Sequence, residues 1–391
     1  MAVNKLDISM MEDVGTSANQ LLQRDGSGNI PAVDGSLLTS VDPGFTVSTS
    51  DPVVTTNPSG GVGSLWYNKT DGEMYVCTDA TAGENVWTNV GAGTGDVAPN
   101  PAPRQGTQYG YHFGGDSPRV NVIQKYSYTS AANATDVGNL SEVTTNSPDN
   151  VCSASHGYSM GHQNDATNSN VIEKWSFTTD GNSTDVGDLS SAVYGTMGSA
   201  TMTYGYCMGG SPYINEIQRV SFSTDGNATD VGDMTGNQAN GGSSMSATHG
   251  YCHGGQVSGP NVNNIEKFAF GASASGSDVG DLTITIRYPA SSQSSTYGYS
   301  HGGQNPSSPW YSNVIEKYSF SSDGNASDVG DMFTNLQGTS GSSSENYGYH
   351  TGGNDATNRN YIARFAFASD GNSADHADLI NSVANGAGNQ Y

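Results

Sequence analysis

The sequence Tyr297-Gly-Tyr-Ser-His-Gly-Gly303, followed by Asn313-Val-Ile-Glu-Lys-Tyr-Ser-Phe320 and then Ser327-Asp-Val-Gly-Asp-Met332, is one copy of a phrase that occurs six times. The copies open near residues 109, 156, 204, 249, 297 and 347, so the glycine at the second position recurs every 45 to 50 residues. A fixed period of this length is typical of solenoids and propellers. The repeat therefore decides the fold predicted for residues 105–391.

Each copy predicts four strands. A Ser- and Thr-rich stretch such as 199–203 or 291–296 predicts strand a, and after a turn at the Tyr-Gly or His-Gly step, Tyr-x-x-Gly-Gly predicts strand b. Strand c carries an aromatic pair at i and i+2, with Val220 and Phe222 as the exception. An Asp-Gly-Asn turn, which supplies the positive φ of a tight hairpin, then leads to the Asp-Val-Gly-Asp phrase of strand d.

The spacing within strand c indicates sheets that are covered on both faces. Residues two apart share a face, so the aromatic pair points one way, and an isoleucine three residues earlier points the other way. In the fifth copy these residues are Tyr318, Phe320 and Ile315. Four such strands per repeat predict an all-β fold in which residues 105–391 form a six-bladed β-propeller.

The glycine doublets that end strand b resemble the kelch family, for example Gly114-Gly115 and Gly302-Gly303. The second copy departs from that pattern with Gly161-His162, and the tryptophan that kelch repeats place near strand d is absent. The resemblance implies a kelch-like propeller. The last repeat ends with too few residues for a seventh strand b, so residues 384–391 are predicted to supply strand a of the first repeat. Residues 104–108 are the alternative.

The first 45 residues predict an attachment or trimerisation segment. The phrase Ala18-Asn-Gln-Leu-Leu-Gln-Arg-Asp-Gly-Ser-Gly-Asn-Ile-Pro-Ala-Val-Asp-Gly-Ser-Leu-Leu38 has short apolar runs beside glycine turns, which cannot bury themselves alone. It resembles segments of fibre proteins from tailed bacteriophages, where such segments belong to trimeric shafts or particle-attachment regions. The resemblance implies a homotrimer that contacts other virion proteins through this segment.

Residues 46–92 predict a small antiparallel module of three strands, at 64–68, 73–77 and 85–90. The first two flank an Asp-Gly hairpin signal, and Trp66, Tyr75 and Trp87 are expected to form a miniature core rather than a sugar-stacking site. The module resembles small modules of phage fibre and other virion proteins. Residues 93–104 predict a linker with a flexible Gly-rich half and a stiffer Pro-rich half.

Composition excludes several classes of function. The formal charge of −24, with only 13 Lys and Arg, argues against a nucleic-acid partner. The four cysteines show no zinc spacing and are expected to be free thiols. No stretch approaches the roughly 18 apolar residues of a membrane span, and the N-terminus shows no apolar core of a cleavable signal, so neither membrane insertion nor standard export is expected.

The loops between strands b and c are the predicted ligand-binding face. They differ in length and chemistry between copies, whereas the c–d turns are nearly uniform, and diversity confined to one face favours recognition there. The alternative is that these loops vary because nothing constrains them. Candidate ligand-binding residues are Arg119, Asp165, Tyr213, Trp310, Tyr311 and Arg359, whose aromatic planes and polar groups suit sugar faces and hydroxyls.

No catalytic residue, metal ligand or cofactor is predicted. His253 and His301 share a register in adjacent copies, but packing within strands explains them better than a metal does. The Asp-Gly-Asn-x-x-Asp-Val-Gly-Asp phrase gathers carboxylates that calcium would accept, although aspartate at turns needs no metal. A carboxylate pair for glycoside hydrolysis stays open, since acids of different repeats would be able to meet.

Together with the folds predicted above, the resemblance to phage fibre proteins implies a virion structural protein, such as a phage tail fibre or a similar appendage, made in the host cytoplasm and located in the virion. Its propeller would bind a host-surface glycan or protein receptor. The alternatives are a head or capsid decoration fibre, an enzyme that depolymerises surface polysaccharide, and a bacterial surface adhesin. The missing signal peptide disfavours the adhesin.

Overall fold

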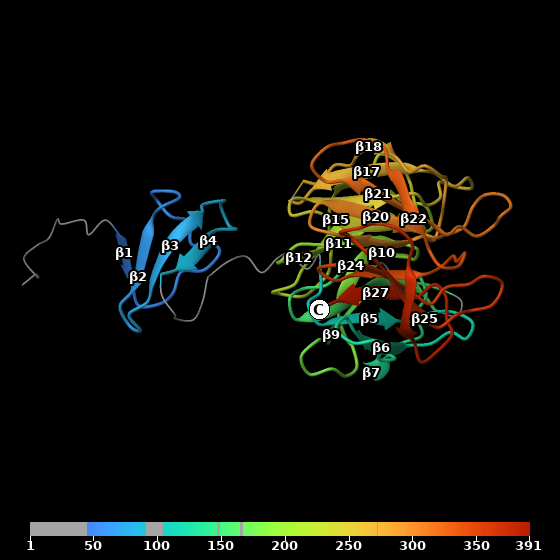
Figure 1. Ribbon diagram of the computed structural model, residues 1–391, viewed down its shortest axis with the longest axis horizontal. Coiled ribbons are helices and arrows are strands. Elements are labelled where there is room, and N and C mark those ends of the chain that lie inside the picture. Colours follow the sequence, from blue (N-terminus) through green and yellow to red (C-terminus); the bar gives the residue numbers. More distant parts are fainter. Residues whose placement is uncertain (1–44, 91–104, 147–148, 165–166, 272) are drawn as a thin grey trace, which may run out of the picture. The chain divides into compact units, whose positions relative to one another are not determined.

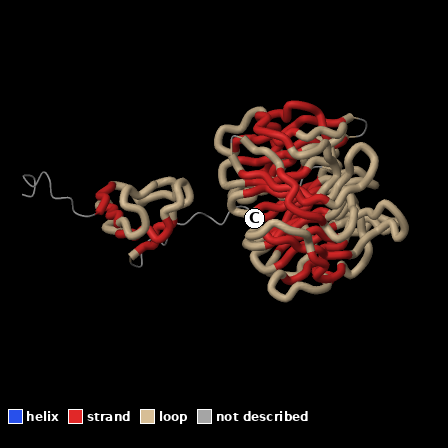
Figure 2. The backbone as a smooth tube through the Cα atoms, turned by 90° about the horizontal axis from the view of Figure 1, so that it is seen from above, coloured by secondary structure: helices blue, strands red, loops and turns tan. Residues whose placement is uncertain are grey.

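The structure is a computed structural model that describes residues 45–90, 105–146, 149–164, 167–271 and 273–391. Within these ranges the chain forms strands, turns and loops and contains no helix, so none that is long and apolar enough to cross a membrane. Figure 2 shows the strands in red and the connections in tan. The described residues belong to two compact units, 45–90 and 105–391. The predicted all-β class is confirmed, whereas the predicted segment 1–45 lies almost entirely outside the described residues.

The smaller unit is one sheet in the order β1-β2-β3-β4. Its strands are Phe45–Ser48, Leu65–Asn68, Met74–Asp79 and Val86–Asn89. Tyr75, Cys77 and Trp87 are buried together, and Trp66 packs edge-on against Trp87 with 5.9 Å between the ring centroids. The three predicted aromatic residues therefore take part in a miniature core.

The prediction of three antiparallel strands in this unit was wrong, because β1 adds a fourth strand that runs parallel to β2. Phe45 lies beside Leu65, and Ser48 lies beside Asn68. Parallel strands need a crossover connection and cannot be joined by a tight hairpin turn. The Asp-Gly signal that marks β2 and β3 therefore has no counterpart between β1 and β2.

The larger unit contains six sheets, numbered here 1 to 6, which follow the six copies of the repeat (Figure 1). Within a sheet the strands are called a to d in hydrogen-bonded order. Sheet 1 comprises β27 (Ala387–Gln390), β5 (Tyr109–Phe113), β6 (Val122–Ser127) and β7 (Thr135–Asn139), and sheet 2 comprises β8 (His156–Gln163), β9 (Asn168–Ser176) and β10 (Thr184–Val193). Sheet 3 comprises β11 (Met197–Ala200), β12 (Tyr204–Met208), β13 (Glu216–Ser221) and β14 (Thr229–Asp233), and sheet 4 comprises β15 (Gly242–Met245), β16 (His249–His253), β17 (Asn264–Ala269) and β18 (Ser277–Asp281). Sheet 5 comprises β19 (Ala290–Gln293), β20 (Tyr297–His301), β21 (Val314–Ser319) and β22 (Ser327–Asp331), and sheet 6 comprises β23 (Ser340–Ser343), β24 (Tyr347–Thr351), β25 (Tyr361–Ala366) and β26 (Ala374–Asp378).

Sheet 2 departs from the predicted four strands. A single bridge between Cys152 and Gly157 stands where strand a of the other sheets lies. His162 replaces the second glycine of the doublet and lies within β8, whereas the corresponding Gly210 of sheet 3 has a φ of 119°. An L-residue disfavours that conformation, so β8 continues where the other b strands turn.

The a–b turn begins earlier than predicted. Strand β19 ends at Gln293, and the Ser294 Oγ accepts hydrogen bonds from the backbone N–H of Thr296 at 3.3 Å and of Tyr297 at 3.0 Å. A serine hydroxyl closes a turn in this way. The Tyr297-Gly298 step, which was predicted to be the turn, is instead paired within strand b.

The glycine of that step is required by an aromatic ring and not by a turn. Gly298 lies opposite Tyr318 in the b–c ladder, and a Cβ atom on Gly298 would come within 2.5 Å of the Tyr318 ring. In sheet 1 the same relation holds between Gly110 and Tyr126, at 2.3 Å. The ring lies over the glycine and fills the space that the missing side chain leaves on the sheet.

Each pair of consecutive sheets encloses a hydrophobic core, and the junction of sheet 6 with sheet 1 is built like the others. Ile123 of β6 packs toward Trp175 of sheet 2, whereas Tyr126 of the same strand packs toward Tyr349 of sheet 6. This confirms that the isoleucine and the aromatic pair of strand c point to opposite faces.

One tyrosine of strand b packs at every junction against the aromatic residue that directly follows strand c of the adjacent sheet. The ring pairs, with centroids 4.6 to 5.0 Å apart, are Tyr111–Phe177, Tyr158–Phe222, Tyr206–Phe270, Tyr251–Phe320, Tyr299–Phe367 and Tyr349–Tyr128. Each such pair contributes about 0.5–1.5 kcal/mol beyond its burial of surface.

The c–d turns bind to the preceding sheet. Lys125 of sheet 1 pairs with Asp180 in the turn of sheet 2, and the Asn182 Oδ1 accepts a hydrogen bond from the Asn139 N–H at 3.0 Å. The same asparagine bond recurs, at 3.1 Å, in Asp188–Asn227, Asp281–Asn325, Asp331–Asn372 and Asp378–Asn133. The last of these joins sheet 6 to sheet 1. The uniform turn sequence is therefore an inter-sheet contact as well as a hairpin.

The a strands pack against one another through small residues. Strands β11, β15, β19, β23 and β27 contact each other in this order, and β27 also contacts β8. A Cβ atom on Gly341 would lie 1.8 Å from the carbonyl oxygen of Ser291, and one on Gly388 would lie 2.2 Å from that of Gly341. Larger side chains cannot occupy these two positions without a shift of the backbone.

Six residues that precede the a strands form a circuit of backbone hydrogen bonds. Each N–H donates to the carbonyl of the corresponding residue before the preceding a strand, at 2.7 to 3.0 Å, and each residue has a φ between 54° and 62°. In order they are Asn146, Gly195, Asn240, Tyr288, Gly338 and Asn385, and the Asn146 N–H donates to Asn385. Glycine and asparagine tolerate this left-handed conformation best, which explains five of the six residues.

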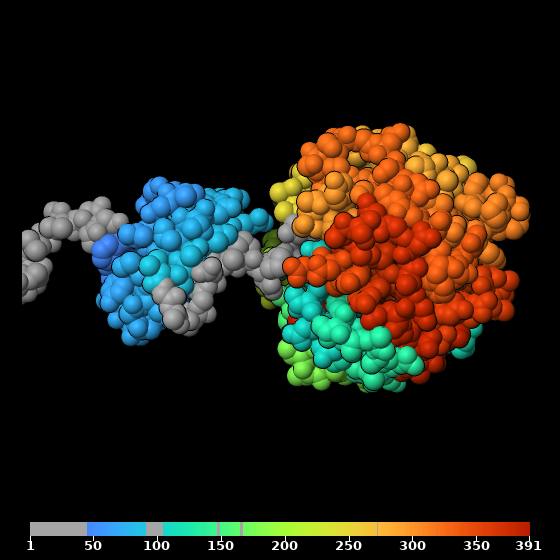
Figure 3. Space-filling model, viewed as in Figure 1, coloured from blue at the N-terminus to red at the C-terminus, as the bar shows by residue number. Residues whose placement is uncertain are grey.

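The C-terminal strand β27 belongs to the first repeat. It pairs antiparallel with β5, with Ala387 opposite Phe113 and Gln390 opposite Gly110. In Figure 3 the red residues of the last repeat lie directly against the cyan and green residues of the first repeat. The prediction for residues 384–391 is confirmed. The alternative was wrong, because Gly106 bridges to Ser344 at the end of β23.

Candidate functional site

The b–c loops and the segments that lead into the a strands lie at the same end of the sheets, called here the loop end. Six isolated bridges join them. The bridged pairs are Asp116–Ala384, Thr145–Gln163, Tyr194–Ser211, Ala239–Gln256, Arg287–Gln304 and Gln337–Asn354. The predicted ligand-binding loops therefore have a framework of inner segments behind them.

A groove lies at the loop end between the b–c loops of sheets 4 and 5. It has a volume of about 200 Å³ and is lined by Gly259, Pro260, Asn261, Arg287, Gln304, Asn305, Pro306 and Trp310. Trp310 is 56% exposed, compared with 40% for Phe333 and 36% for Tyr297. The groove thus presents an indole face beside amide and guanidinium groups.

Hydrogen bonds hold the side chains of this groove in place. The Asn305 N–H donates to the Trp310 carbonyl at 3.0 Å, and the Asn305 Nδ2 donates to the Pro309 carbonyl at 2.6 Å. Arg287 donates from Nε to the Gln304 Oε1 at 2.6 Å and from Nη1 to the Gln256 Oε1 at 3.0 Å. The loop that carries Trp310 is therefore tied down before any ligand arrives, which lowers the entropic cost of binding.

The chemistry of the groove suits binding better than catalysis. An exposed indole stacks on apolar faces of a ligand, and Asn, Gln and Arg side chains exchange hydrogen bonds with hydroxyl or carbonyl groups. No Asp or Glu is among the residues that line it. The groove therefore lacks the two carboxyl groups that glycoside hydrolysis ordinarily needs.

The structure places the six predicted residues apart and not in one site. Trp310 lines the groove, and the partly buried Tyr311 follows it, with its carbonyl accepting a hydrogen bond from the Asn335 Nδ2 at 2.9 Å. Arg359 is committed to Asp355 through two hydrogen bonds of 2.8 Å. That pairing and its hydrogen bonds with Thr357 overcome partial burial and lower the pKa of Asp355.

The other three predicted residues belong to different surroundings. Arg119 donates from Nη1 to the carbonyl of Asn164 in the neighbouring loop. Tyr213 is partly buried and helps to raise the pKa of Tyr288, for which burial is the main cause. Asp165 lies outside the described residues.

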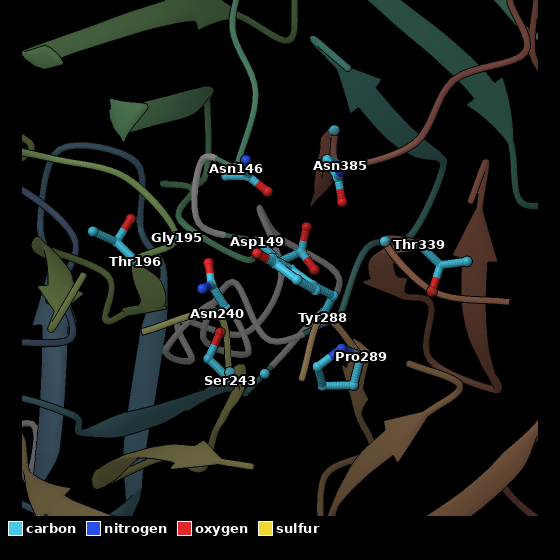
Figure 4. A pocket seen from close by; sticks show the side chains of 14 residues that line it. Asn146, Asp149, Gly195, Thr196, Asn240, Ser243, Tyr288, Pro289, Thr339 and Asn385 are labelled. Atoms are coloured by element: carbon cyan, nitrogen blue, oxygen red, sulfur yellow. The ribbon is translucent and has the colours of Figure 1, made fainter. Parts of the chain in front are cut away.

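A second hollow, the central cavity, lies inside the circuit of backbone hydrogen bonds. Asn146, Asn240, Asn385, Thr339 and Tyr288 surround the carboxyl group of Asp149 (Figure 4). The sequence reasoning missed this cavity and Asp149. The sequence does carry a signal for Asp149. It is an acidic residue where the second repeat aligns with strand a, and none of the a strands β11, β15, β19, β23 and β27 contains an Asp or a Glu.

The histidines noted in the sequence pack inside the sheets. His253 is fully buried, with its Nδ1 3.0 Å from the Tyr318 hydroxyl and its Nε2 3.3 Å from the Ser291 Oγ. His301 is also fully buried, with its Nε2 3.1 Å from the Ser292 Oγ. Burial lowers the pKa of His253 to about 3 and that of His301 well below its usual value. Packing as the explanation of their shared register is confirmed.

The carboxylates of the c–d turns have partners within the protein. Lys174 lies 2.6 Å from Asp225 of such a turn, and in the strand d that follows a turn the Asp136 Oδ1 accepts a hydrogen bond from the Gly138 N–H at 3.0 Å. In the part of the chain that the structure describes, no three His, Cys, Asp or Glu side chains gather as a metal site. All four cysteines are buried thiols outside any disulfide.

Comparison with known proteins adds no relative to this picture. No protein-family model matches the sequence, and no curated protein matches it.

Proposed function

We propose that residues 105–391 form a closed, six-bladed, kelch-like β-propeller. The support comes from the junction of sheets 6 and 1, which repeats the features of the other junctions. Tyr349 stacks on Tyr128 at 4.6 Å, the Asn133 Oδ1 accepts the Asp378 N–H at 3.1 Å, and the Ala134 N–H donates to the Asp378 carbonyl at 2.8 Å. Six equivalent junctions give every sheet a neighbour on both faces, which is the condition for a ring of blades.

We further propose that the protein is a virion structural protein, a phage tail fibre or similar appendage, that binds a glycan of the host surface. The groove of Trp310 carries this proposal. A half-exposed indole on a tied loop, beside Arg287 and Asn261 and with no acid in the lining, is suited to stacking on a sugar face and bonding its hydroxyls. The resemblance of residues 18–38 to phage fibre segments supplies the virion setting.

The binding part of the proposal is tested by substitution at the loop end. The wild-type protein is screened against a panel of purified bacterial surface polysaccharides, and binding constants are measured by calorimetry for a polysaccharide that binds. Trp310→Ala is expected to weaken binding by about 10- to 100-fold, because a buried aromatic contact is a typical binding hot spot. Tyr297→Ala, which removes a tyrosine 36% exposed at the opposite end of sheet 5, is the matched control and is expected to leave binding unchanged.

Three outcomes would count against this proposal. Equal affinity of Trp310→Ala and wild type would remove the groove from the binding site. Release of reducing ends from the polysaccharide would favour the depolymerase alternative. Absence of the protein from purified particles in immunogold electron microscopy would refute the virion setting, and labelling of the head would favour the decoration fibre.

The proposed trimer is tested separately. Light scattering coupled to size-exclusion chromatography of the full chain is expected to give three times the mass of 40.5 kDa. A monomer would contradict it.

A further inference from the structure

The groove of Trp310 lies in a part of the loop end that carries no acidic residue. The segments that contain its lining residues are 254–264, 283–289 and 302–314. None of the three contains an Asp or a Glu, although the protein has 37 acidic residues, and Arg287 is their one charged residue. The b–c loops of sheets 1, 2 and 6 carry Asp116, Asp165 and Asp355. A strongly acidic protein therefore has one positive charge and no negative charge in the segments that form this groove.

The framework of the loop end does not require that charge. Arg287 directly precedes Tyr288 of the backbone circuit, and its backbone is bridged to that of Gln304. The residues at the same position in the other repeats are Thr145, Tyr194, Ala239, Gln337 and Ala384. All five are uncharged and form the equivalent bridge. The guanidinium group of Arg287 is therefore specific to this groove.

A second groove, between the b–c loops of sheets 6 and 1, has the same framework and the opposite charge. It has a volume of about 190 Å³ and is lined by Asp116, Ser117, Gln337, Asn354, Asn358, Ala384 and Asn385. The Asn358 Nδ2 donates to the Asp116 carbonyl, as the Asn261 Nδ2 donates at 3.0 Å to the carbonyl of Gln304. The loops, and not the shared framework, therefore decide the charge that each groove presents to a ligand.

Hydrogen bonds place the guanidinium group between the two loops that form the groove. Its acceptors are the side-chain oxygens of Gln256, from the b–c loop of sheet 4, and of Gln304, from that of sheet 5. It also lies 5.3 Å from the centre of the Tyr288 ring. Among the described residues no carboxylate forms an ion pair with Arg287, in contrast to Arg359 with its partner Asp355.

The partners of Arg287 leave its charge unbalanced. Both glutamine oxygens are neutral, and the two hydrogen bonds use two of the five N–H groups of a guanidinium. Such a group binds carboxylates and phosphates through paired, charge-assisted hydrogen bonds. Arg287 is thus positioned for an anionic acceptor that the described protein does not supply.

We propose that the groove of Trp310 binds an anionic sugar residue, whose carboxylate or phosphate group pairs with Arg287 while its ring stacks on Trp310. This inference rests on the glycan binding proposed above and names the class of glycan. It gives the two residues separate roles, because the indole contributes stacking with any sugar face and the guanidinium contributes the preference for a negative charge.

The test compares each acidic polysaccharide of the panel that binds through Trp310 with a neutral form of the same polymer. Carbodiimide-mediated reduction converts its carboxylates to alcohols, and hydrofluoric acid removes its phosphates, so the two treatments distinguish the two anions. Calorimetry with the wild-type protein is expected to show about 10- to 100-fold weaker binding of the neutral form, because hydrogen bonds between charged groups are lost.

Arg287→Gln is expected to weaken binding of the acidic polymer by the same factor and to leave binding of the neutral form unchanged. A role limited to holding the loops would weaken both forms alike, so the comparison separates the two roles. Arg219→Gln is the matched control, because it removes the same charge from strand c of sheet 3. Arg219 donates to the Gly271 carbonyl at 2.9 Å and lies over the ring of Tyr204, outside the groove.

The outcomes separate this inference from the proposed function. Binding of neutral polysaccharides alone, dependent on Trp310, would overturn the inference and leave the proposed glycan binding intact. Failure of every polysaccharide to bind would remove both. Equal affinity of wild type for the acidic and neutral forms of a bound polymer would also overturn the inference, and this result can be read even if Arg287→Gln does not fold. So would an equal loss of affinity for both forms in Arg287→Gln.

Discussion

The two ends of the repeat sheets make different use of one repeated sequence. At the end opposite the loop end, most c–d turns make the same contacts with the preceding sheet, through pairs such as Lys174–Asp225 and Asp188–Asn227. At the loop end, each b–c loop has its own length and its own partners, from the Arg359–Asp355 pair to the exposed Trp310. The repeated contacts of the turns join the sheets. The b–c loops carry few of these contacts, so their sequences are able to change at the loop end without weakening the packing between sheets.

The outermost strand of each sheet also has a structural role for its repeated residues. Strand d is the edge of each sheet, and an exposed edge is able to pair with another molecule. Exposed aspartates occupy one position of this strand in all six repeats, namely Asp136, Asp185, Asp230, Asp278, Asp328 and Asp375. Part of the charge of −24 therefore protects the edges from aggregation, independently of any ligand.

The largest effect is expected from removal of the C-terminal strand β27, which pairs with β5 of the first repeat. Deletion of residues 387–391 removes β27 and its ladder with β5, and it exposes the aromatic residues of sheet 1. We expect the unfolding free energy to fall by more than about 5 kcal/mol, which is most of the stability of a typical domain. Calorimetry measures this loss, and an unchanged melting temperature would refute the closing role of β27.

The next largest effect is expected from acid. Burial lowers the pKa of His112 to about 4 and that of His350 to about 3, and it lowers those of His253 and His301 as well. These residues stay neutral in the folded protein and take up protons on unfolding below pH 6.5. Stability is therefore present above pH 6.5 and lost as the pH falls toward 4, by about 1.4 kcal/mol per pH unit for each histidine.

Urea unfolding at pH 7.5 and pH 5 measures this acid effect. Asp149 opposes it by one proton, because its raised pKa favours the folded state at low pH. His253→Gln should reduce the dependence by about a quarter of the histidine contribution. Equal stability of wild type at the two pH values would contradict the burial of neutral histidines.

A smaller effect is expected from a single methyl group among the a strands. Gly341→Ala places a Cβ atom against the Ser291 backbone and should cost about 1–3 kcal/mol, the usual range for an overpacked core. Gly236→Ala is the control, since Gly236 has no left-handed φ and no atom within 4 Å of an added Cβ. It should be neutral or slightly stabilising. Similar melting temperatures for both variants would show that the a strands are less tightly packed than described.

Much of the framework was predictable because its signals are local. The spacing of Ile315, Tyr318 and Phe320 gave the two covered faces, and the count of residues after the last strand d gave the pairing of the C-terminal tail. The Tyr-Gly step was misread as a turn because a glycine that lies under a ring looks, in sequence, like a glycine that turns. The parallel β1 strand was missed because no hairpin signal marks it.

Within the candidate site, the sequence led to Trp310 but not to its surroundings. The diversity of the b–c loops indicated the loop face. The groove itself is lined by Asn261 and Trp310 from the loops of two different sheets and by Arg287 from the segment that connects those sheets in the chain. Such a grouping depends on how neighbouring sheets are stacked, and residue spacing within one repeat carries no information about it.

The sequence by itself determined the repeat, the all-β class, the opposed faces of strand c and the partner of the C-terminal strand, because each follows from periodicity along one stretch of chain. Only the tertiary structure decided the circuit of backbone hydrogen bonds and the place of Asp149 inside it. The Asp149 carboxyl group meets the N–H groups of Gly341 and Gly388, which lie 192 and 239 residues away along the chain. Contacts over such distances arise when separate sheets converge, so the place of this carboxyl group at the centre is visible only in the folded protein.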